Sequence, residues 1–356
     1  MTDARGGRGL AFAAVVLAAV VALVAAGCGG DPAPPDNPFG EPPAPVAGVS
    51  AWAVGETGSV LVTADGGASW TRRPFFLPQR GVDVAFPTQS DGWLITDAGI
   101  VLSSRDGGAT WTVRQKARLQ MTAVAATDAG HAWVLGNTVG AAGEPGVSAV
   151  LRSDDGGETW ERRPFGAALL ADIAFADDRH GWLVALDRVW STKDGGRTWR
   201  LRRRLGMTVL TGVTSSDRRH AFVAGWGTLD GAPFLLATRD GGVTWSRRLI
   251  DLQAPASGAL QSQQIAYAGT DVLWVTCKAG IMATTDAGRT WELQKPPAGE
   301  PLGVAAADAE HVLATTYGQP ILSSSDGGAT WRASGKEGFL KQGLVSIAAV
   351  KGAAAE

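Results

Sequence analysis

The chain has 356 residues, and its 32 basic and 34 acidic side chains leave a formal net charge of −2 at pH 7. This near-neutrality argues against a nucleic-acid-binding protein, because such proteins carry an excess of lysine and arginine. Only two cysteines are present, Cys28 and Cys277, so the fold must rely on a buried hydrophobic core rather than on a set of disulfides.

The N-terminal segment has the features of a secretory signal. Arg5 and Arg8 precede an apolar run at residues 10–26, and small residues lead from this run to Cys28. A basic start, an apolar stretch and a small-residue cleavage point predict a signal peptide at residues 1–27. The run is close to the lower limit of about 17 residues for spanning a bilayer, so an uncleaved anchor helix is the alternative.

The end of this segment, Leu23-Val24-Ala25-Ala26-Gly27-Cys28, resembles a lipobox. In a lipobox the cysteine receives acyl chains and becomes the mature N-terminus, so the resemblance implies lipidation of Cys28. Two or more acyl chains hold a protein stably on a membrane. Residues 28–45 are rich in proline, which predicts an extended tether. We therefore expect an exported protein that is lipid-anchored to the cell envelope, at the periplasmic face of the inner or the outer membrane.

An internal repeat dominates the rest of the chain. The pattern Ser/Thr-x-Asp-x-Gly-x-Ser/Thr-Trp, the Asp-box, recurs at intervals of roughly 40 to 50 residues, the length of one four-stranded propeller blade. The seven copies lie at residues 63–70, 104–111, 153–160, 192–199, 238–245, 284–291 and 324–331. Their aspartates are Asp65, Asp106, Asp155, Asp194, Asp240, Asp286 and Asp326. Seven copies in register predict an all-β, seven-bladed propeller over residues 46–352, followed by a tail at 353–356.

Each repeat predicts four antiparallel strands, with the box at the turn between the third and the fourth. In the second repeat the strands are expected at residues 82–86, 93–96, 100–104 and 111–114. The box aspartate can accept hydrogen bonds from nearby backbone N–H groups, and the glycines supply conformations with positive φ. We therefore interpret the box aspartates as structural and expect the box tryptophans to pack between blades.

The first repeat lacks an innermost strand, because only a short segment separates residue 46 from the strand that contains Trp52. The C-terminal part of the chain offers a spare strand at residues 344–350. We expect this segment to complete the N-terminal blade and close the ring, which removes free sheet edges.

Seven boxes at this spacing resemble the Asp-box, or bacterial neuraminidase repeat, propellers. Preceded by a lipobox, they resemble the photosystem II assembly and stability factor family and its lipoprotein relatives, over residues 46–352. The resemblance implies a non-enzymatic protein that binds newly made membrane-protein segments on the exported side. It also implicates an arginine-rich surface in that binding.

A sialidase-like glycoside hydrolase is the first alternative, because Asp-boxes also occur in sialidases. Such a site needs an arginine triad and a Tyr–Glu pair, but the sequence has only Tyr267 and Tyr317 and lacks the N-terminal arginine motif. Asp83 and Asp172 share one position in repeats two and four and should face the central channel. Paired carboxylates about 5–10 Å apart can hydrolyse glycosides. Without a substrate cleft, we interpret these two as solvated residues of the channel mouths.

The four histidines stand at one repeat position, immediately before the second strand: His131, His180, His220 and His311. Since they belong to four different blades, most of them cannot converge on one ion as a zinc site requires. We interpret them as turn residues and expect no metal, no cofactor and no catalytic residue.

The face opposite the Asp-boxes is where we expect a partner to bind, because there the repeat loses its uniformity. Trp226 is the one tryptophan that the repeat does not explain, and we expect it in the loop after the second strand of repeat five. Equivalent places are held by Tyr317 in repeat seven, Lys278 in repeat six and Asp97 in repeat two. Long connections are expected on this face at residues 136–149, 225–233 and 247–264.

Arginines follow several box tryptophans, and the densest group is Arg200 with Arg202, Arg203 and Arg204. Two interpretations stay open. Charged residues on an outermost strand prevent edge-to-edge pairing, and guanidinium groups can bind the carboxylates of a partner or anionic headgroups.

We predict one partner-binding site across repeats four to seven, with Trp226 as its apolar anchor and Arg203 or Arg204 as its charged group. The expected function is that of a monomeric, membrane-anchored assembly or stability factor that binds a protein. The alternatives are a glycan-binding or sialidase-like protein and an accessory lipoprotein of an envelope export system.

Overall fold

A computed structural model describes most of the region that the repeats predict as a propeller. The described residues are 44–55, 58–74, 79–138, 146–166, 168–250, 262–296, 299–317, 320–334 and 343–352. They all belong to one compact unit, Glu41–Glu356. The predicted signal peptide, Cys28 and nearly all of the predicted tether lie outside them. Within the described part of the chain, no helix is long and apolar enough to cross a membrane.

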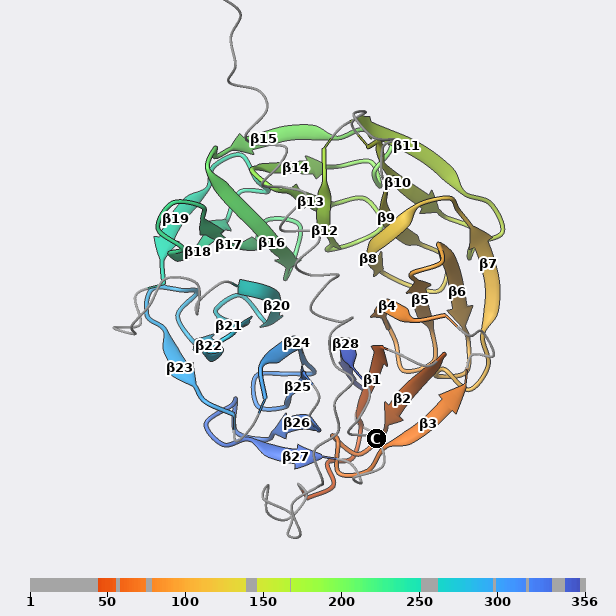
Figure 1. Cartoon of the computed structure of the whole chain (residues 1–356), viewed down its shortest axis with the longest axis vertical. Coiled ribbons are helices and arrows are strands. Elements are labelled where there is room, and N and C mark those ends of the chain that lie inside the picture. Colours follow the sequence, from red (N-terminus) through yellow and green to blue (C-terminus); the bar gives the residue numbers. More distant parts are fainter. Residues whose placement is uncertain are drawn as a thin grey trace, which may run out of the picture. The chain divides into compact units, whose positions relative to one another are not determined.

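Seven four-stranded antiparallel sheets stand in a ring around a central channel (Figure 1). Blades one to three consist, from the channel outward, of β28 (Leu344–Lys351), β1 (Val49–Gly55), β2 (Ser59–Thr63) and β3 (Thr71–Pro74); β4 (Gly81–Ala85), β5 (Gly92–Thr96), β6 (Ile100–Ser104) and β7 (Thr112–Lys116); and β8 (Gln120–Ala126), β9 (Ala132–Asn137), β10 (Ser148–Ser153) and β11 (Glu161–Gly166).

Blades four to seven follow the same order: β12 (Leu170–Phe175), β13 (Gly181–Ala185), β14 (Arg188–Thr192) and β15 (Arg200–Arg204); β16 (Thr208–Ser215), β17 (Ala221–Gly227), β18 (Pro233–Thr238) and β19 (Ser246–Leu249); β20 (Ser262–Ala268), β21 (Val272–Cys277), β22 (Gly280–Thr284) and β23 (Glu292–Gln294); and β24 (Pro301–Ala306), β25 (Val312–Thr316), β26 (Ile321–Ser324) and β27 (Arg332–Ser334). The predicted all-β, seven-bladed propeller is confirmed.

The C-terminal strand closes the ring in the predicted way. β28 pairs antiparallel with β1 over the whole length of β1, with Trp52 opposite Ala348. The pairing ends where the Gly352 N–H donates to the Gly48 carbonyl at 2.7 Å. Blade one therefore takes its innermost strand from the end of the chain and the other three from its beginning.

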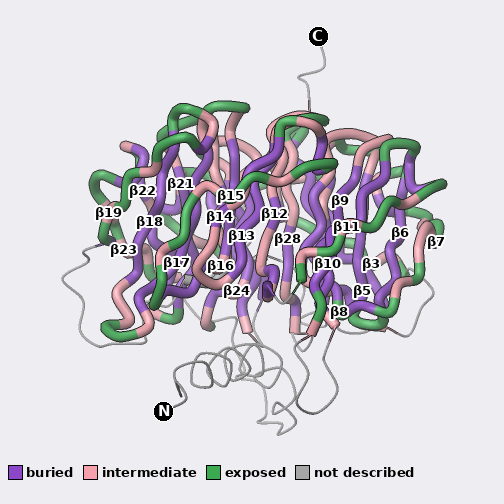
Figure 2. Tube along the Cα trace, turned by 90° about the horizontal axis from the view of Figure 1, so that it is seen from above, coloured by how far each residue is buried: buried purple, intermediate pink, exposed green. Residues whose placement is uncertain are grey.

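Burial falls from the middle of each blade to its outer edge (Figure 2). The second and third strands of blade two, β5 and β6, are buried at every residue, whereas the outermost strand of blade one, β3, is exposed at all but one. Strands in the middle of a blade are covered on both sides by the neighbouring blades, which explains their nearly continuous apolar sequence.

Each Asp-box is a turn held by its own side chains. In blade five, Asp240 accepts hydrogen bonds from the Thr244 Oγ1 at 2.5 Å, the Thr238 Oγ1 at 2.8 Å and the Thr244 N–H at 2.9 Å. The hydrogen bonds from Thr244 and Thr238 lower the pKa of Asp240 to about 2. Gly241 and Gly242 have φ angles of 72° and 83°, which glycine adopts at little cost.

Some boxes also join their blade to the one before it. The Gly107 carbonyl in the box of blade two accepts the Trp52 Nε1–H at 2.9 Å and the Arg73 Nη1–H at 3.0 Å, both from blade one. The Gly327 carbonyl in blade seven accepts Trp274 and Gln294 from blade six in the same way, at 3.0 and 3.1 Å. At these two junctions a second-strand tryptophan and a fourth-strand side chain donate to one carbonyl of the next blade.

Candidate functional site

The expected position of Trp226 is wrong. Trp226 lies inside β17 rather than in a loop, opposite Val209 of β16 and Pro233 of β18, and only 7% of its surface is exposed. β17 continues for two residues, Trp226 and Gly227, beyond the end that the repeat predicted for this strand. The predicted long connection at 225–233 is therefore only Thr228–Ala232, so Trp226 belongs to the core and not to the surface.

The other residues predicted on this face lie in the turns where the repeat places them. Asp97 is exposed in the turn between β5 and β6, and Lys278 is exposed between β21 and β22. Tyr317 is partly buried after β25, with its N–H bonded to the Glu300 carbonyl at 2.9 Å. In the described part of the chain, no hydrogen bond or ion pair joins these three residues to one another or to the arginines of blade four. Of the predicted connections at 136–149 and 247–264, residues 139–145 and 251–261 lie outside the described residues, and both ends of each range belong to strands.

The arginines of β15 differ in their surroundings. Arg202 is half-buried, and its Nε–H donates to the Ser191 Oγ at 2.7 Å. Arg203 and Arg204 are exposed. Arg204 pairs with Asp187 at 3.3 Å, whereas Arg203 forms no ion pair or side-chain hydrogen bond with any described residue. Of the three predicted binding arginines, Arg202 is thus an internal contact of blade four.

Two exposed apolar residues that the sequence analysis missed lie on the connections that follow β15 and β17. Met207, between β15 and β16, has 67% of its surface exposed, and Leu229, between β17 and β18, has 80% exposed. Their loops are joined by the Thr228 N–H, which donates to the Met207 carbonyl at 3.0 Å. The sequence contains an indication that Leu229 is exposed, because this leucine stands in an otherwise polar turn, Thr-Leu-Asp-Gly.

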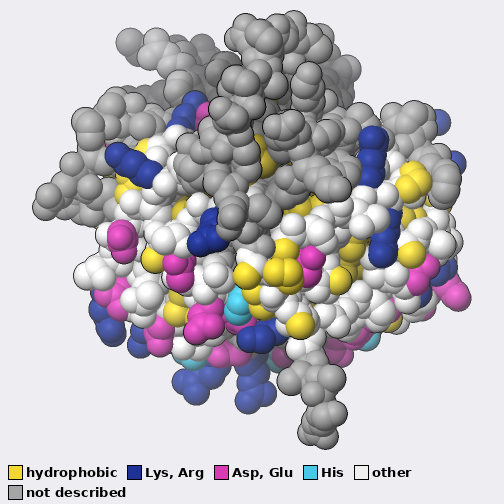
Figure 3. Space-filling view, turned by 90° about the horizontal axis from the view of Figure 1, so that it is seen from below, with side chains coloured by type: hydrophobic (Ala, Val, Ile, Leu, Met, Phe, Trp, Pro, Cys, Tyr) yellow, Lys and Arg dark blue, Asp and Glu magenta, His cyan; other side chains and the backbone are white. Residues whose placement is uncertain are grey.

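We call Arg203, Arg204, Met207, Leu229 and Asp187 the blade 4–5 surface. Met207 has a φ of 44°, a left-handed conformation that is uncommon for residues other than glycine. Asp187 forms ion pairs with both Arg188, at 3.4 Å, and Arg204, so its carboxylate is already paired with arginines of the same blade. Seen from one side, the propeller carries small groups of hydrophobic side chains with both basic and acidic side chains among them (Figure 3).

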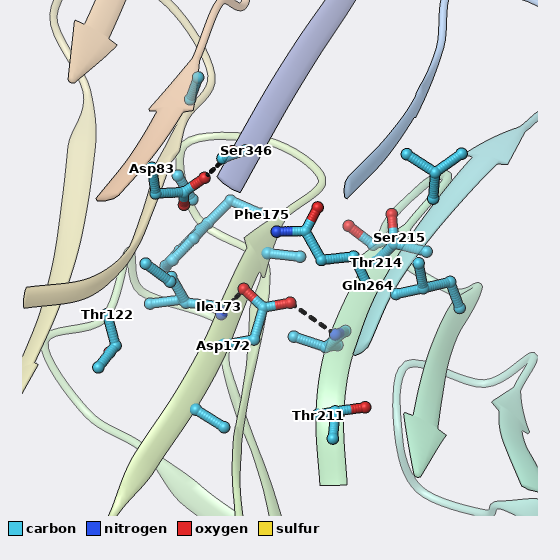
Figure 4. A pocket seen from close by; sticks show the side chains of 18 of the residues that line it. Asp83, Thr122, Asp172, Ile173, Phe175, Thr211, Thr214, Ser215, Gln264 and Ser346 are labelled. Carbon is cyan, nitrogen blue, oxygen red and sulfur yellow. Dashed lines mark hydrogen bonds between the residues drawn. The ribbon is translucent and has the colours of Figure 1, made fainter. Parts of the chain in front are cut away.

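A second polar site lies in the central channel. Asp83 on β4 and Asp172 on β12 line it together with Ala85 and Ala174, as the repeat position predicts (Figure 4). Each carboxylate bridges two blades. Asp83 accepts the Val124 N–H of blade three at 2.9 Å and Asp172 accepts the Val213 N–H of blade five at 2.8 Å.

Both aspartates lie in the channel wall and are partly buried. Burial raises the pKa of Asp83 to about 6, even though its carboxylate accepts hydrogen bonds from Ser346 and two backbone N–H groups. Burial raises the pKa of Asp172 to about 7, and the neighbouring charge of Asp83 adds to this rise. The interpretation of the two as solvated residues of the channel mouths stays a prediction, and each carboxylate has a second role in joining two blades.

The sequence matches the family model for photosynthesis system II assembly factor YCF48 over residues 76–170 and 207–353, more than half of the chain. The chain belongs to this family. No curated protein sequence matches it.

Solved structures of YCF48 have the same fold as this YCF48-family chain. YCF48 from Cyanidioschyzon merolae is 22% identical with a TM-score of 0.57, covering 78% of this chain and 90% of that one. A structure described as YCF48 bound to D1 peptide is 19% identical with a TM-score of 0.54, covering 85% and 86%. An ancestral GH74 enzyme is 14% identical with a TM-score of 0.57, covering 86% of this chain but 47% of that one. At these identities the likenesses show the fold alone.

The histidines of this YCF48-family propeller are held in Asp–His turns. In blade three the His131 Nδ1 lies 2.9 Å from Asp128 Oδ2, and in blade five the His220 Nδ1 lies 2.7 Å from Asp217 Oδ2. His180 and His311 have the same arrangement, which agrees with their interpretation as turn residues. Among the described residues, no group of three or more His, Cys, Asp or Glu side chains is placed to hold a metal ion.

Proposed function

We propose that this YCF48-family propeller is a non-enzymatic assembly or stability factor that binds an extended segment of a protein partner at the blade 4–5 surface. The observation that carries the proposal is the exposure of Met207 and Leu229 on two hydrogen-bonded loops, the first of which directly follows the exposed Arg203 and Arg204 of β15. Single exposed apolar residues are ordinary on protein surfaces. Two on adjoining loops, with exposed arginines at the end of the preceding strand, have the composition of a protein interface.

The charges suggest the chemistry of the partner. Arg203 has no acidic partner among the described residues, and Arg204 is 67% exposed in spite of its pairing with Asp187. Guanidinium groups form two parallel hydrogen bonds with a carboxylate. A partner segment with a carboxylate beside an apolar side chain therefore fits this surface. The relative described as YCF48 bound to D1 peptide supports a peptide-binding role for the fold.

The backbone of Met207 supports the same conclusion. A left-handed conformation at a residue with a side chain costs on the order of 1 kcal/mol. Gly206, immediately before it, has a φ of 60°, and a Cβ added there would meet nothing within 4 Å, so glycine is used where the chain needs only a turn. Retaining methionine at the next position presents a flexible apolar side chain to solvent, as interaction surfaces do.

A glycoside hydrolase is the rival function, and the channel brings the carboxylates of Asp83 and Asp172 into one cavity. These carboxylates accept backbone N–H groups from the next blade and hold the blades together. The likeness to a GH74 enzyme is one of fold. We therefore propose binding, and not catalysis, as the activity of this chain.

We also propose that the protein is exported and acts as a monomer tethered to the membrane by lipid on Cys28. This rests on the lipobox-like segment and on the proline-rich residues 28–45. Mass spectrometry of the N-terminal peptide from the native host should show an acylated cysteine, and Cys28→Ala should release the protein from membranes. A mature N-terminus that contains residue 27 or lacks acyl chains would refute the anchor.

The partner site is tested by crosslinked capture from the native host. Met207→Ser with Leu229→Ser, and Arg203→Glu with Arg204→Glu, should each lower partner capture at least about tenfold, since central interface residues contribute on the order of 2 kcal/mol. The control is Val243→Ser, which removes an apolar residue that is 62% exposed in the box of blade five. Equal capture by all variants, or loss only in the control, would place the site elsewhere.

A further inference from the structure

The central channel contains a cavity of about 380 Å³ between the innermost strands. Its lining combines small apolar side chains, such as Ala85, Ala174 and Ile265, with acidic and hydroxyl groups. A cavity of this size is within the range that binds small organic molecules. The alanines leave the space open, because a larger side chain at the same positions would fill it.

The charge of this cavity is not balanced. Asp83 and Asp172 line it, and no lysine, arginine or histidine is among its described lining residues. Asp172 accepts two hydrogen bonds, both from backbone N–H groups, and a carboxylate offers about four acceptor sites. Acceptor capacity and negative charge therefore remain in the cavity after the contacts between blades are made.

The repeat does not require carboxylates here. At the same register position blades three, five and seven carry Ala123, Gly212 and Gly303. In three of the blades, the contacts with the neighbouring blade thus form without a carboxylate at this position. The two aspartates are additions to the repeat, and a partly buried carboxylate without a counter-ion costs stability unless a ligand neutralises it.

Two further polar groups point to a ligand. The Gln264 side chain extends from β20 toward the space between the two aspartates (Figure 4), and its side-chain amide makes no hydrogen bond with any described residue, whereas its backbone N–H donates to the Thr276 Oγ1. Ser215 also lines the cavity with only 3% of its surface exposed, and its hydroxyl has no hydrogen-bond partner in the described structure. Buried polar groups usually have partners, so these two are available to a bound molecule.

We propose that the channel binds a protonated primary alkylamine, with its ammonium group between Asp83 and Asp172 and its carbon chain along the alanine and isoleucine wall. An ammonium group has three donors and no acceptor, which complements the two carboxylates. A hard metal ion such as Ca²⁺ takes about six to eight oxygen ligands, which two carboxylates do not supply. The apolar wall likewise fits an alkyl chain better than a bare ion.

The titration of the aspartates adds a directional expectation. Burial raises the pKa of both groups, to about 6 for Asp83 and about 7 for Asp172. Tyr267 is the other titratable residue that lines the cavity, and burial raises its pKa as well. An ammonium ion binds the ionised carboxylates, so amine affinity should increase between about pH 5 and pH 8 and binding should release protons.

The test is calorimetric titration of the intact protein with n-butylamine, with 1-butanol as the neutral molecule of the same shape. We expect butylamine to bind at least about tenfold more tightly than butanol at about pH 8, and more weakly at about pH 5. Asp172→Asn should weaken butylamine binding at least about tenfold, whereas the matched control Asp97→Asn, outside the channel, should leave it unchanged. Nα-acetyl-lysine amide is titrated in parallel. Tighter binding of this probe than of butylamine identifies a lysine side chain as the natural source of the amine, and the reverse identifies a free amine.

Asp172 also accepts the Val213 N–H, so Asp172→Asn changes a contact between blades as well as the charge. The comparison of butylamine with butanol in the unaltered protein therefore accompanies the variant. Equal affinity for butylamine and butanol, or an amine affinity that does not rise with pH, would overturn the proposal. So would a folded Asp172→Asn protein, checked by circular dichroism, that binds butylamine normally. Binding of Ca²⁺ without binding of butylamine would show a metal site and equally refute the amine.

Discussion

On the Asp-box face the seven turns are nearly interchangeable, whereas on the opposite face each turn has its own chemistry. In every box the aspartate accepts the hydroxyl of the Ser or Thr two residues earlier and that of the Ser or Thr four residues later. Opposite them, the turn after β5 is held by Asp97, and the turn after β17 exposes Leu229. Turns that stabilise the fold keep the same sequence pattern in every blade. Turns without that role can differ from blade to blade and serve function.

The largest change in stability is expected at Trp226. Its place in the repeat predicted a position on the variable face, whereas its burial shows that it belongs to the core. Trp226→Ala should lower the free energy of unfolding by about 3–5 kcal/mol, because it leaves a cavity between β16 and β18. Urea denaturation measures this. Leu229→Ala, at the second residue of the loop that follows β17, should lower the free energy of unfolding by less than about 0.5 kcal/mol. Similar costs for the two variants would mean that the side chain of Trp226 is not packed as described.

The next effect compares an aspartate from each face. Asp65 accepts three hydrogen bonds, from the Thr63 Oγ1 at 2.6 Å, the Ser69 Oγ at 2.6 Å and the Ser69 N–H at 2.9 Å. Asp65→Ala should cost about 2 kcal/mol in urea denaturation, because these donors lose an ionised acceptor. Asp97 accepts one long bond, from the Arg80 N–H at 3.3 Å, and Asp97→Ala should cost less than about 0.5 kcal/mol. A larger cost for Asp97 would contradict the division into a structural and a variable face.

Aspartates of the box face and of the channel should act oppositely on the pH dependence of stability. The pKa of Asp155 is lowered to about 2 by hydrogen bonds from Thr159, so its stabilising contribution is present above about pH 4 and is lost as the pH falls below that value. The pKa of Asp172 is raised to about 7 by burial and by Asp83. Its contribution is greatest below about pH 4 and is lost as the pH rises through about 7.

Asp172→Asn should therefore flatten the fall in stability of the free protein between about pH 5 and pH 8, by on the order of 2 kcal/mol. Denaturation curves at several pH values, with Asp155→Asn as the comparison, measure this difference. A pH profile of Asp172→Asn that remains parallel to that of the wild-type protein would show that the channel carboxylate titrates normally.

The smallest effect concerns two glycines with positive φ, Gly241 in a box and Gly206 on the opposite face, at 72° and 60°. A Cβ at residue 241 would lie 3.2 Å from the Arg218 carbonyl oxygen, whereas one at 206 would meet nothing within 4 Å. Both alanine variants should lose about 1 kcal/mol from the left-handed conformation alone. Gly241→Ala should lose a few tenths of a kcal/mol more, since crowding is added to strain. Thermal unfolding of the two variants side by side checks the order, and a greater loss at 206 would reverse it.

By itself the sequence determined the repeat and therefore the fold. Seven boxes with fixed internal spacing define seven identical turns, and the spare strand at residues 344–350 has only the incomplete first blade to join. Local chemistry is sufficient for these features, because the hydrogen bonds of Asp65 or Asp240 are made within a few residues of the same turn. The placement of Asp83 and Asp172 in the channel followed from the same register.

Tertiary structure decided which residues reach the surface and which are desolvated. Trp226 became core because β17 extends two residues past the repeat and β16 and β18 cover it, and no local pattern encodes that cover. Arg202 and Arg203 are neighbours in sequence, yet Arg202 bonds to Ser191 and Arg203 is exposed, because Arg202 is the extra residue of a β-bulge between Leu201 and Arg203. The pKa values of the channel aspartates depend on how completely seven inner strands from the whole length of the chain exclude water around them.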